Sequence, residues 1–292
     1  MSVGVPNFGG WSGGDWRGLV DVARIAEDAG VDRIVVVDHV VMGRNTDAYA
    51  WGRFPVPPEA PWLEPLTVLT AMAAVTSTLR LSTGILIAPL RPAALLAKQV
   101  ATLDALSGGR VDLGVGVGWQ REEYDAVGLD FARRGALLDD TIAACRALWS
   151  QLPASYASGS VRFDDTFCSP QPVQTRLPVW FGGTLTPRML ARIVDLGDGW
   201  IPIMGATLQD VRDGADRLAA AASRPLDVQM RAPTVTGADG AADPTGTMGA
   251  VPELVAAGVT DVTVNLAAFA PTLAEAPAAL SALGKAFREG TK

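Results

Sequence analysis

The chain alternates short apolar segments with amphipathic segments along its whole length, and this alternation constrains its fold more than any other feature. Strands are expected at 3–6, 33–37, 80–87, 110–119, 179–181, 199–204, 226–231 and 261–266. Helices are expected at 15–29, 66–78, 92–107, 133–152, 187–196, 208–222 and 252–257, with a last helix ending at residue 288. Eight strand–helix units over 292 residues predict a single-domain (β/α)8 barrel covering 1–292. A doubly wound sheet is the alternative, but it normally needs fewer strands.

Three irregular segments are expected as insertions after strands two, four and seven. They are 41–63, 153–178 and 236–247, and the second is expected to hold a short hairpin. The first is rich in proline, arginine and tryptophan and has no clear period. Because long loops in compact domains are usually functional, we expect this loop to take part in the site.

The segment Arg110–Trp119, RVDLGVGVGW, has one aliphatic face and one face with almost no side chains. Glycine at alternate positions lets another backbone or a flat ligand approach closely. The pattern is typical of a buried parallel strand whose end opens onto a binding site. It is not a dinucleotide fingerprint, because Trp119 stands in place of the third glycine and no helix opens at once. Trp119 either stacks on a bound ring or packs at the barrel rim.

Composition narrows the classes of partner. The formal net charge is −7 and there is no basic run, so we expect no nucleic-acid partner. Cys145 and Cys168 give neither a disulfide framework nor a metal-ligand spacing, so no metal is expected and a reducing, cytoplasmic location is favoured. No apolar run approaches membrane-spanning length, so we expect no membrane partner.

Candidate site residues follow from the barrel, because the carboxyl ends of its strands and the loops after them form the active site. This rule gathers Asn7, Asp38-His39, 84–88, Gly118-Trp119, 182–184 and 202–204 around one mouth. His39 is the only histidine of the chain and directly precedes the long loop. A lone histidine can be a core or capping residue, but one at a strand's carboxyl end suits proton transfer to a bound molecule.

The turn at Gly182-Gly183-Thr184 connects an expected strand to a helix that begins at Pro187. Free N–H groups at a helix start attract anions, and glycines let a phosphate approach the backbone. The turn is therefore a candidate phosphate site. The alternative is an ordinary turn with a threonine cap.

Several of these motifs together resemble one family. Asp38-His39 and the segments LSTGILIAPLRPAALLAKQVATLDALSGGRVDLGVGVGWQREEY, RGALLDDTIAACRALW, LPVWFGGTLTPRML and LGDGWIP are similar to the bacterial luciferase-like superfamily. More narrowly, they resemble its actinobacterial branch of deazaflavin-dependent oxidoreductases. The similarity covers nearly the whole chain, and the motifs occur in the family's order. Members of the superfamily use either reduced FMN or the deazaflavin coenzyme F420.

The resemblance implies roles for individual residues around a flavin-type ring. His39 corresponds to a proton-handling histidine beside the ring, with Asp38 next to it. Gly84-Ile85 matches a position where many deazaflavin members have a non-prolyl cis peptide, in a bulge that backs the middle ring.

Two further matches lie near the phosphate and near the ring. Gly182, Gly183 and Thr184 match the family's backbone phosphate site, and Gly118-Trp119 matches a strand end near the ring. Sugar-phosphate dehydrogenases of the family have a glutamate where this chain has Trp119, which argues against sugar-phosphate oxidation.

The function implied is hydride transfer between F420 and a small organic substrate, with His39 supplying or accepting a proton. Arg44, Trp51, Trp62 and Arg91 are expected to line the substrate side. The alternatives are a reduced-FMN monooxygenase and a non-catalytic flavin-binding barrel. We expect a homo-oligomer, in the form of a dimer.

Overall fold

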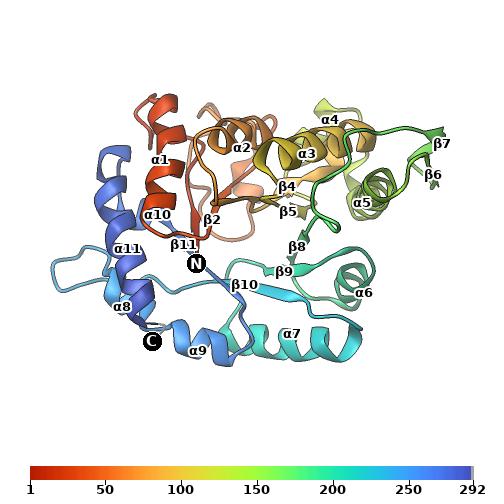
Figure 1. Cartoon of the computed structure of the whole chain (residues 1–292). Helices are drawn as coiled ribbons and strands as arrows, with labels where there is room; N and C mark the ends of the chain where they lie inside the picture. Colours follow the sequence, from red (N-terminus) through yellow and green to blue (C-terminus); the bar gives the residue numbers. More distant parts are fainter. Residues whose placement is uncertain (291–292) are drawn as a thin grey trace.

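A closed barrel of eight parallel strand positions organises the chain, as the alternation predicts (Figure 1). We describe residues 1–290 of a computed structural model. The barrel strands are β1 (Ser2–Gly4), β2 (Arg33–Val36), β3 (Arg80–Thr83) with β4 (Leu86–Ile87), β5 (Val111–Gly116), β8 (Val179–Gly183), β9 (Gly199–Pro202), β10 (Asp227–Arg231) and β11 (Asp261–Asn265). The sheet runs β3-β2-β1-β11-β10-β9-β8-β5-β4, and a parallel pairing of β3 with β5 closes it.

Helices cover the outside of the barrel (Figure 1). They are α1 (Trp16–Asp28), α2 (Pro65–Ala73), α3 (Ala93–Ser107), α4 (Arg121–Ala126), α5 (Arg134–Ser150), α6 (Pro187–Leu196), α7 (Leu208–Ala221), α8 (Pro244–Met248), α9 (Val251–Ala256), α10 (Leu266–Phe269) and α11 (Ala276–Gly290). Short 3-10 turns are η1 (Thr46–Ala48), η2 (Ala88–Leu90), η3 (Phe131–Arg133) and η4 (Leu273–Glu275). The expected hairpin is confirmed as β6 (Ala154–Ala157) with β7 (Arg162–Thr166). No helix within 1–290 is long and apolar enough to cross a membrane.

Three helices differ from the sequence-based expectation. Helix α2 ends at Ala73 rather than 78, because the Glu27 carboxylate accepts hydrogen bonds from the N–H groups of 77–79 and holds them away from the helix. Helix α8 begins inside the expected loop 236–247, since Asp243 caps its first turn. Helix α4 was not expected, because six residues are too few to show a helical period.

The third barrel position is divided at Gly84-Ile85, where one continuous strand was expected. Strands β3 and β4 lie on either side of this peptide, and both pair with β5. The Gly84-Ile85 peptide is cis, as the family resemblance implies.

The glycine face of β5 points into the barrel. Asp112 shows this orientation, because its carboxylate binds Arg33 at 2.8 Å and Arg80 at 2.6 Å inside the ring of strands. A Cβ at Gly114 would lie 2.0 Å from the carbonyl oxygen of Thr83, and one at Gly116 would lie 2.9 Å from the Ile85 side chain. Another strand's backbone and one side chain therefore occupy the space that these glycines leave.

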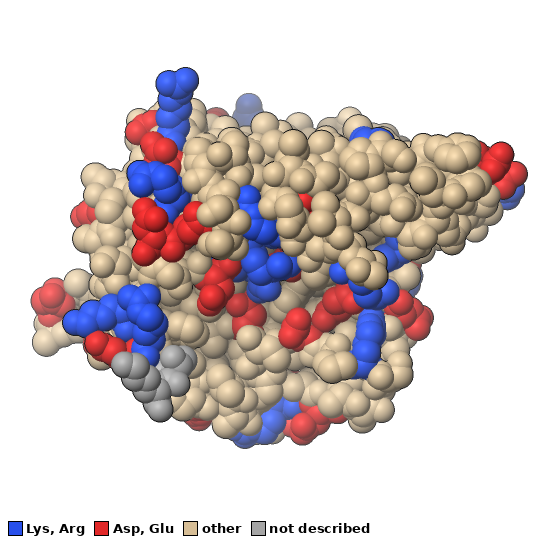
Figure 2. Space-filling view, viewed as in Figure 1, with Lys and Arg blue, Asp and Glu red and all other residues tan. Residues whose placement is uncertain are grey.

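Intermixed acidic and basic side chains lie on the face shown in Figure 2, and no large patch there has a single sign.

We predict that Gly114→Ala destabilises the barrel by about 2–3 kcal/mol, because the new methyl overlaps a backbone carbonyl that is held by strand pairing. Urea unfolding measures the change. Gly10→Ala is the matched control: no atom lies within 4 Å of its added Cβ, so we expect a change within about 0.5 kcal/mol. Equal unfolding midpoints for the two variants would contradict the packing described for β5.

Candidate active site

The segment that carries His39 leaves the carboxyl end of β2 and is clamped by Asn7. The buried Asn7 amide donates to the carbonyl oxygens of Val37 and Leu63, each at 2.8 Å, and its oxygen accepts from the Val37 N–H at 3.1 Å. One side chain thus fixes both ends of the long loop between β2 and α2. This places Asn7 and His39 together at the mouth, as expected from the barrel.

Glu123 holds the His39 ring from the opposite side of the loop. His39 Nδ1 lies 3.1 Å from Glu123 Oε2, while Glu123 Oε1 accepts from the Val40 N–H at 2.9 Å. The Glu123 side chain is 0% exposed and that of His39 is 9% exposed. Because a carboxylate only accepts, Nδ1 carries the proton and Nε2 is the ring nitrogen left for a ligand.

Gln120 extends this clamp along the loop. Its side-chain oxygen accepts from the Gly43 N–H at 2.7 Å, and its amide donates back to the Gly43 carbonyl at 3.2 Å. Sequence reasoning missed both Glu123 and Gln120. The available signal was the pair Glu122-Glu123 shortly after the fourth barrel strand.

An aromatic cluster surrounds the histidine. We use this name for the side chains of Tyr49, Trp51, Phe54, Trp62 and Trp119. The rings of Trp62, Phe54 and Trp119 face His39 edge-on at centroid distances of 4.6, 5.7 and 6.0 Å. Trp62 Nε1 is buried and has no hydrogen-bond partner within the described residues. The predicted Trp51, Trp62 and Trp119 therefore belong to the same cluster as His39.

Asp38 and Arg91 form a buried ion pair. Arg91 donates to both Asp38 oxygens, at 2.7 and 3.1 Å, and to Glu64 at 2.8 Å. The Asp38 carboxylate also accepts from the Ile87 N–H at 2.9 Å. Burial acts to lower the pKa of Arg91, but the bonds and charges of Asp38 and Glu64 raise it above its ordinary value. The structure thus places Asp38 and Arg91 in a brace between β2 and β4, whereas the predicted Arg44 is exposed on the loop.

The bulge at Ile85 and the turn after β8 meet inside the mouth. A Cβ at Gly182 would lie 2.6 Å from Ile85 Cγ2, and one at Gly118 would lie 3.0 Å from Ile87. Gly183 has a φ of +148°, and its carbonyl accepts from Trp200 Nε1 at 2.8 Å. Thr184 is exposed at this turn. The cap of α6 comes from Thr186, whose hydroxyl accepts from the Met189 N–H.

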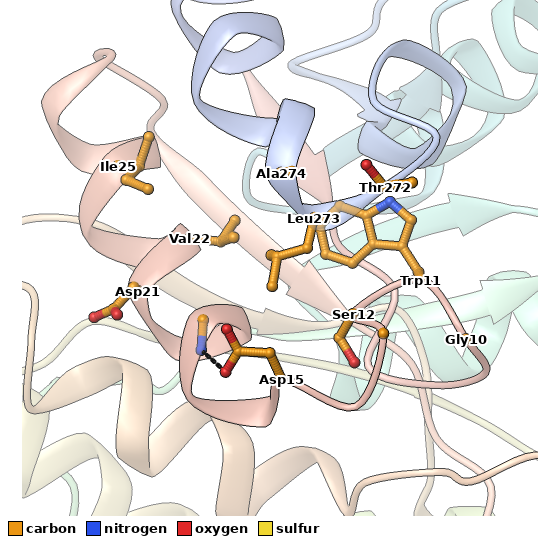
Figure 3. A pocket seen from close by; sticks show the side chains of 12 residues that line it. Gly10, Trp11, Ser12, Asp15, Asp21, Val22, Ile25, Thr272, Leu273 and Ala274 are labelled. Atoms are coloured by element: carbon orange, nitrogen blue, oxygen red, sulfur yellow. Dashed lines mark hydrogen bonds between the residues drawn. The ribbon is translucent and has the colours of Figure 1, made fainter.

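A cavity of about 500 Å³ lies elsewhere, between the first turns of α1 and the segment around Leu273 (Figure 3). None of the predicted site residues lines it. Asp15 and Asp21 are its acidic side chains, and Asp15 already accepts the Gly18 N–H as the cap of α1. This cavity is therefore separate from the candidate site.

Comparison with known proteins identifies the family. A model of the luciferase-like monooxygenase family matches residues 4–242. The chain belongs to this family. It is 36% identical to an uncharacterised protein of Mycobacterium tuberculosis over 191 residues. The match covers 63% of this chain and 68% of the relative. It is 31% identical to an FMNH2-dependent dimethylsulfone monooxygenase of Pseudomonas putida over 166 residues. That match covers 55% of this chain and 44% of the relative.

Solved structures share the fold at low identity. A monooxygenase from Streptomyces bottropensis matches with a TM-score of 0.82 and 18% identity, and the match covers 100% of both chains. The coenzyme F420-dependent tetrahydromethanopterin reductase from Methanopyrus kandleri matches with a TM-score of 0.72 and 17% identity, over 100% of this chain and 99% of that one. The family supports an oxidoreductase or monooxygenase, and the coenzymes named for these similar proteins differ: FMNH2 for one and F420 for another.

We predict that the His39 ring is the Nδ1–H tautomer at pH 8, because the Glu123 carboxylate accepts from that nitrogen. Nitrogen-15 NMR of the imidazole measures this without ambiguity, since His39 is the only histidine. Glu123→Ala should shift the ring towards the Nε2–H form that free histidine prefers, while Glu122→Ala should leave it unchanged. An Nε2–H tautomer in the unaltered protein would contradict the geometry described here.

Proposed function

We propose that this protein is an oxidoreductase that binds the deazaflavin F420 at the barrel mouth and transfers a hydride between it and a small organic substrate. The observation that carries the proposal is the single histidine, His39, held through Nδ1 by the buried Glu123 and ringed by aromatic side chains in a luciferase-like barrel. F420 is the first candidate because the sequence resembles the deazaflavin branch of the family.

The residues present fit a flat coenzyme with a phosphate. The buried, unpartnered Nε1 of Trp62 is a donor aimed at no protein acceptor, as expected for a group that meets a ligand. The turn Gly182–Thr184 leaves backbone and an exposed hydroxyl at the start of a ten-residue helix, which suits a phosphate. Ile85 lies between this turn and the mouth, where it would back the ring. When bound, the deazaflavin supplies two-electron hydride chemistry.

The chain's own part is to position groups, move a proton and exclude water. His39 Nε2 accepts or donates a proton at the substrate, and the Glu123 carboxylate keeps the ring oriented and stabilises it when it is charged. The aromatic cluster borders the histidine and keeps water from the reacting atoms. The brace of Asp38 and Arg91 fixes β4 next to Ile85, so the ring platform and the histidine keep a constant separation.

A reduced-FMN monooxygenase is the second candidate. The identity to the Pseudomonas putida FMNH2-dependent enzyme favours it, although the chain spans less than half of that protein's length. Both coenzymes present a flat tricyclic ring and a phosphate to the protein. Binding of the separate coenzymes therefore distinguishes the two functions.

The test is titration of the purified protein with F420 and with FMN, followed by quenching of tryptophan fluorescence. We predict an F420 Kd at about low micromolar or tighter and weaker binding of FMN. Trp62 and Trp119 border the site and report binding directly. Tight binding of FMN with no binding of F420 would overturn the proposal and establish the monooxygenase alternative.

Three variants test where the coenzyme binds. Thr184→Asp should raise the F420 Kd at least about tenfold, because it adds a negative charge at an exposed phosphate turn, whereas Thr184→Asn is the uncharged control. Thr184 is a cleaner position than Gly183, because the φ of +148° at Gly183 would strain any side chain. His39→Ala should change the Kd far less, because its part is proton transfer. An unchanged Kd in Thr184→Asp would show that the phosphate binds elsewhere.

A further inference from the structure

Arg231 ends β10, the seventh barrel strand, and its side chain points into the mouth. Two residues earlier, Gln229 donates to Asp261 at 2.7 Å inside the barrel, whereas Val228 and Met230, at the alternate positions, pack in the apolar core. Because side chains alternate along a strand, Arg231 shares the inward face of Gln229. The Arg231 side chain is exposed, so a ligand that enters the mouth can reach it.

Arg231 differs from the other arginines that face the lumen. Arg33 binds Asp112 and Asp261, and Arg80 binds Asp112. Arg231 has no ion pair and no side-chain hydrogen bond with any residue in 1–290. Burial lowers its pKa, and the hydroxyl group of Tyr49 is the only group that acts to raise it. An arginine at the mouth with no counter-charge keeps its guanidinium available for a charge-assisted pair with an anionic ligand.

The surroundings of Arg231 suit the rest of an organic anion. Its register partner on β11 is Thr263, whose side chain faces the same way and has no hydrogen bond within the described chain. Tyr49 lies above it from the long loop, and its hydroxyl reaches Met204 at 3.5 Å. The ring centroids of Tyr49 and Trp119 are 5.3 Å apart, and the Trp119 ring in turn packs edge-on against His39. An apolar surface therefore runs from Arg231 to the histidine.

We propose that the substrate is an organic anion, whose carboxylate or phosphate binds the Arg231 guanidinium and the Thr263 hydroxyl while its apolar body lies on the aromatic cluster. That the anion is a substrate rests on the proposed function, whereas its binding at Arg231 does not. The anion site follows the seventh barrel strand, whereas the proposed coenzyme phosphate follows the fifth. The same mouth therefore holds two separate anion sites.

Three small probes test the proposal: benzoate, phenyl phosphate and the neutral benzamide. We expect benzoate or phenyl phosphate to quench tryptophan fluorescence saturably and benzamide to bind more weakly. Arg231→Gln should raise the Kd of the anion by about 10- to 100-fold, as expected for a lost charge-assisted pair, and should leave benzamide unchanged. Arg231→Lys should keep part of the affinity, because it retains the charge without the planar fork.

Controls separate this site from the coenzyme site. Arg162→Gln removes an exposed arginine from the hairpin strand β7 and should leave every Kd unchanged. The F420 Kd should change less than about threefold in Arg231→Gln. Equal loss of F420 and anion binding would overturn the proposal by assigning Arg231 to the coenzyme phosphate. The proposal would also be overturned if the anions bound no better than benzamide, or if Arg231→Gln left the Kd of the anion unchanged.

Failure of the proposed function gives a different result. If the protein binds neither F420 nor FMN but benzoate or phenyl phosphate still binds in an Arg231-dependent way, the reaction assignment fails and the anion site stands. Thermal unfolding of Arg231→Gln verifies its fold, and we expect no loss of stability because the side chain makes no bond to the described chain.

Discussion

The Asp38 carboxylate is the interaction on which the geometry of the mouth depends. It accepts from Ile87 on β4 and from Arg91 after η2, so it joins the end of β2 to the strand beyond the Ile85 bulge. Its neighbour His39 points the other way, towards Glu123 and the aromatic cluster. The two adjacent side chains thus lie on opposite sides of one strand end. Asp38 holds the neighbouring backbone in place, and His39 is available for proton transfer.

The pairing of charged side chains inside the barrel differs between the two ends of the strands. Near the start of the strands, Arg33, Arg80, Asp112 and Asp261 neutralise one another, and such pairs are costly to break singly because the remaining charge stays buried. At the opposite end, Arg231 has no such counter-charge within 1–290. This division matches the general behaviour of (β/α)8 barrels, in which the amino ends of the strands maintain stability and the carboxyl ends carry function.

Much of the fold could be predicted from the sequence, because local signals agree with the final structure. Helix α6 has the expected bounds, since Thr186 and Pro187 start it and Gly197 follows it. The pair Glu122-Glu123 was visible in the sequence, but the contact of Glu123 with His39 was not, because the helix has six residues and the two residues are 84 positions apart. Arg231 could not be found either. In the sequence, an arginine at the end of a strand looks like any exposed arginine, and only the structure shows that no carboxylate of the described chain pairs with it. Among predicted site residues, the pairing of Asp38 with Arg91 was equally hidden, because it depends on how two loops pack.

The central claim is that one mouth orients a flat coenzyme between the Ile85 bulge and His39. A crystal structure of the complex with F420 tests it most directly. The account predicts that the ring lies against Ile85 with His39 Nε2 on its substrate side, and that the phosphate meets the backbone at Gly183 and Thr184. A coenzyme phosphate bound to Arg231, or a ring bound outside the aromatic cluster, would contradict the account.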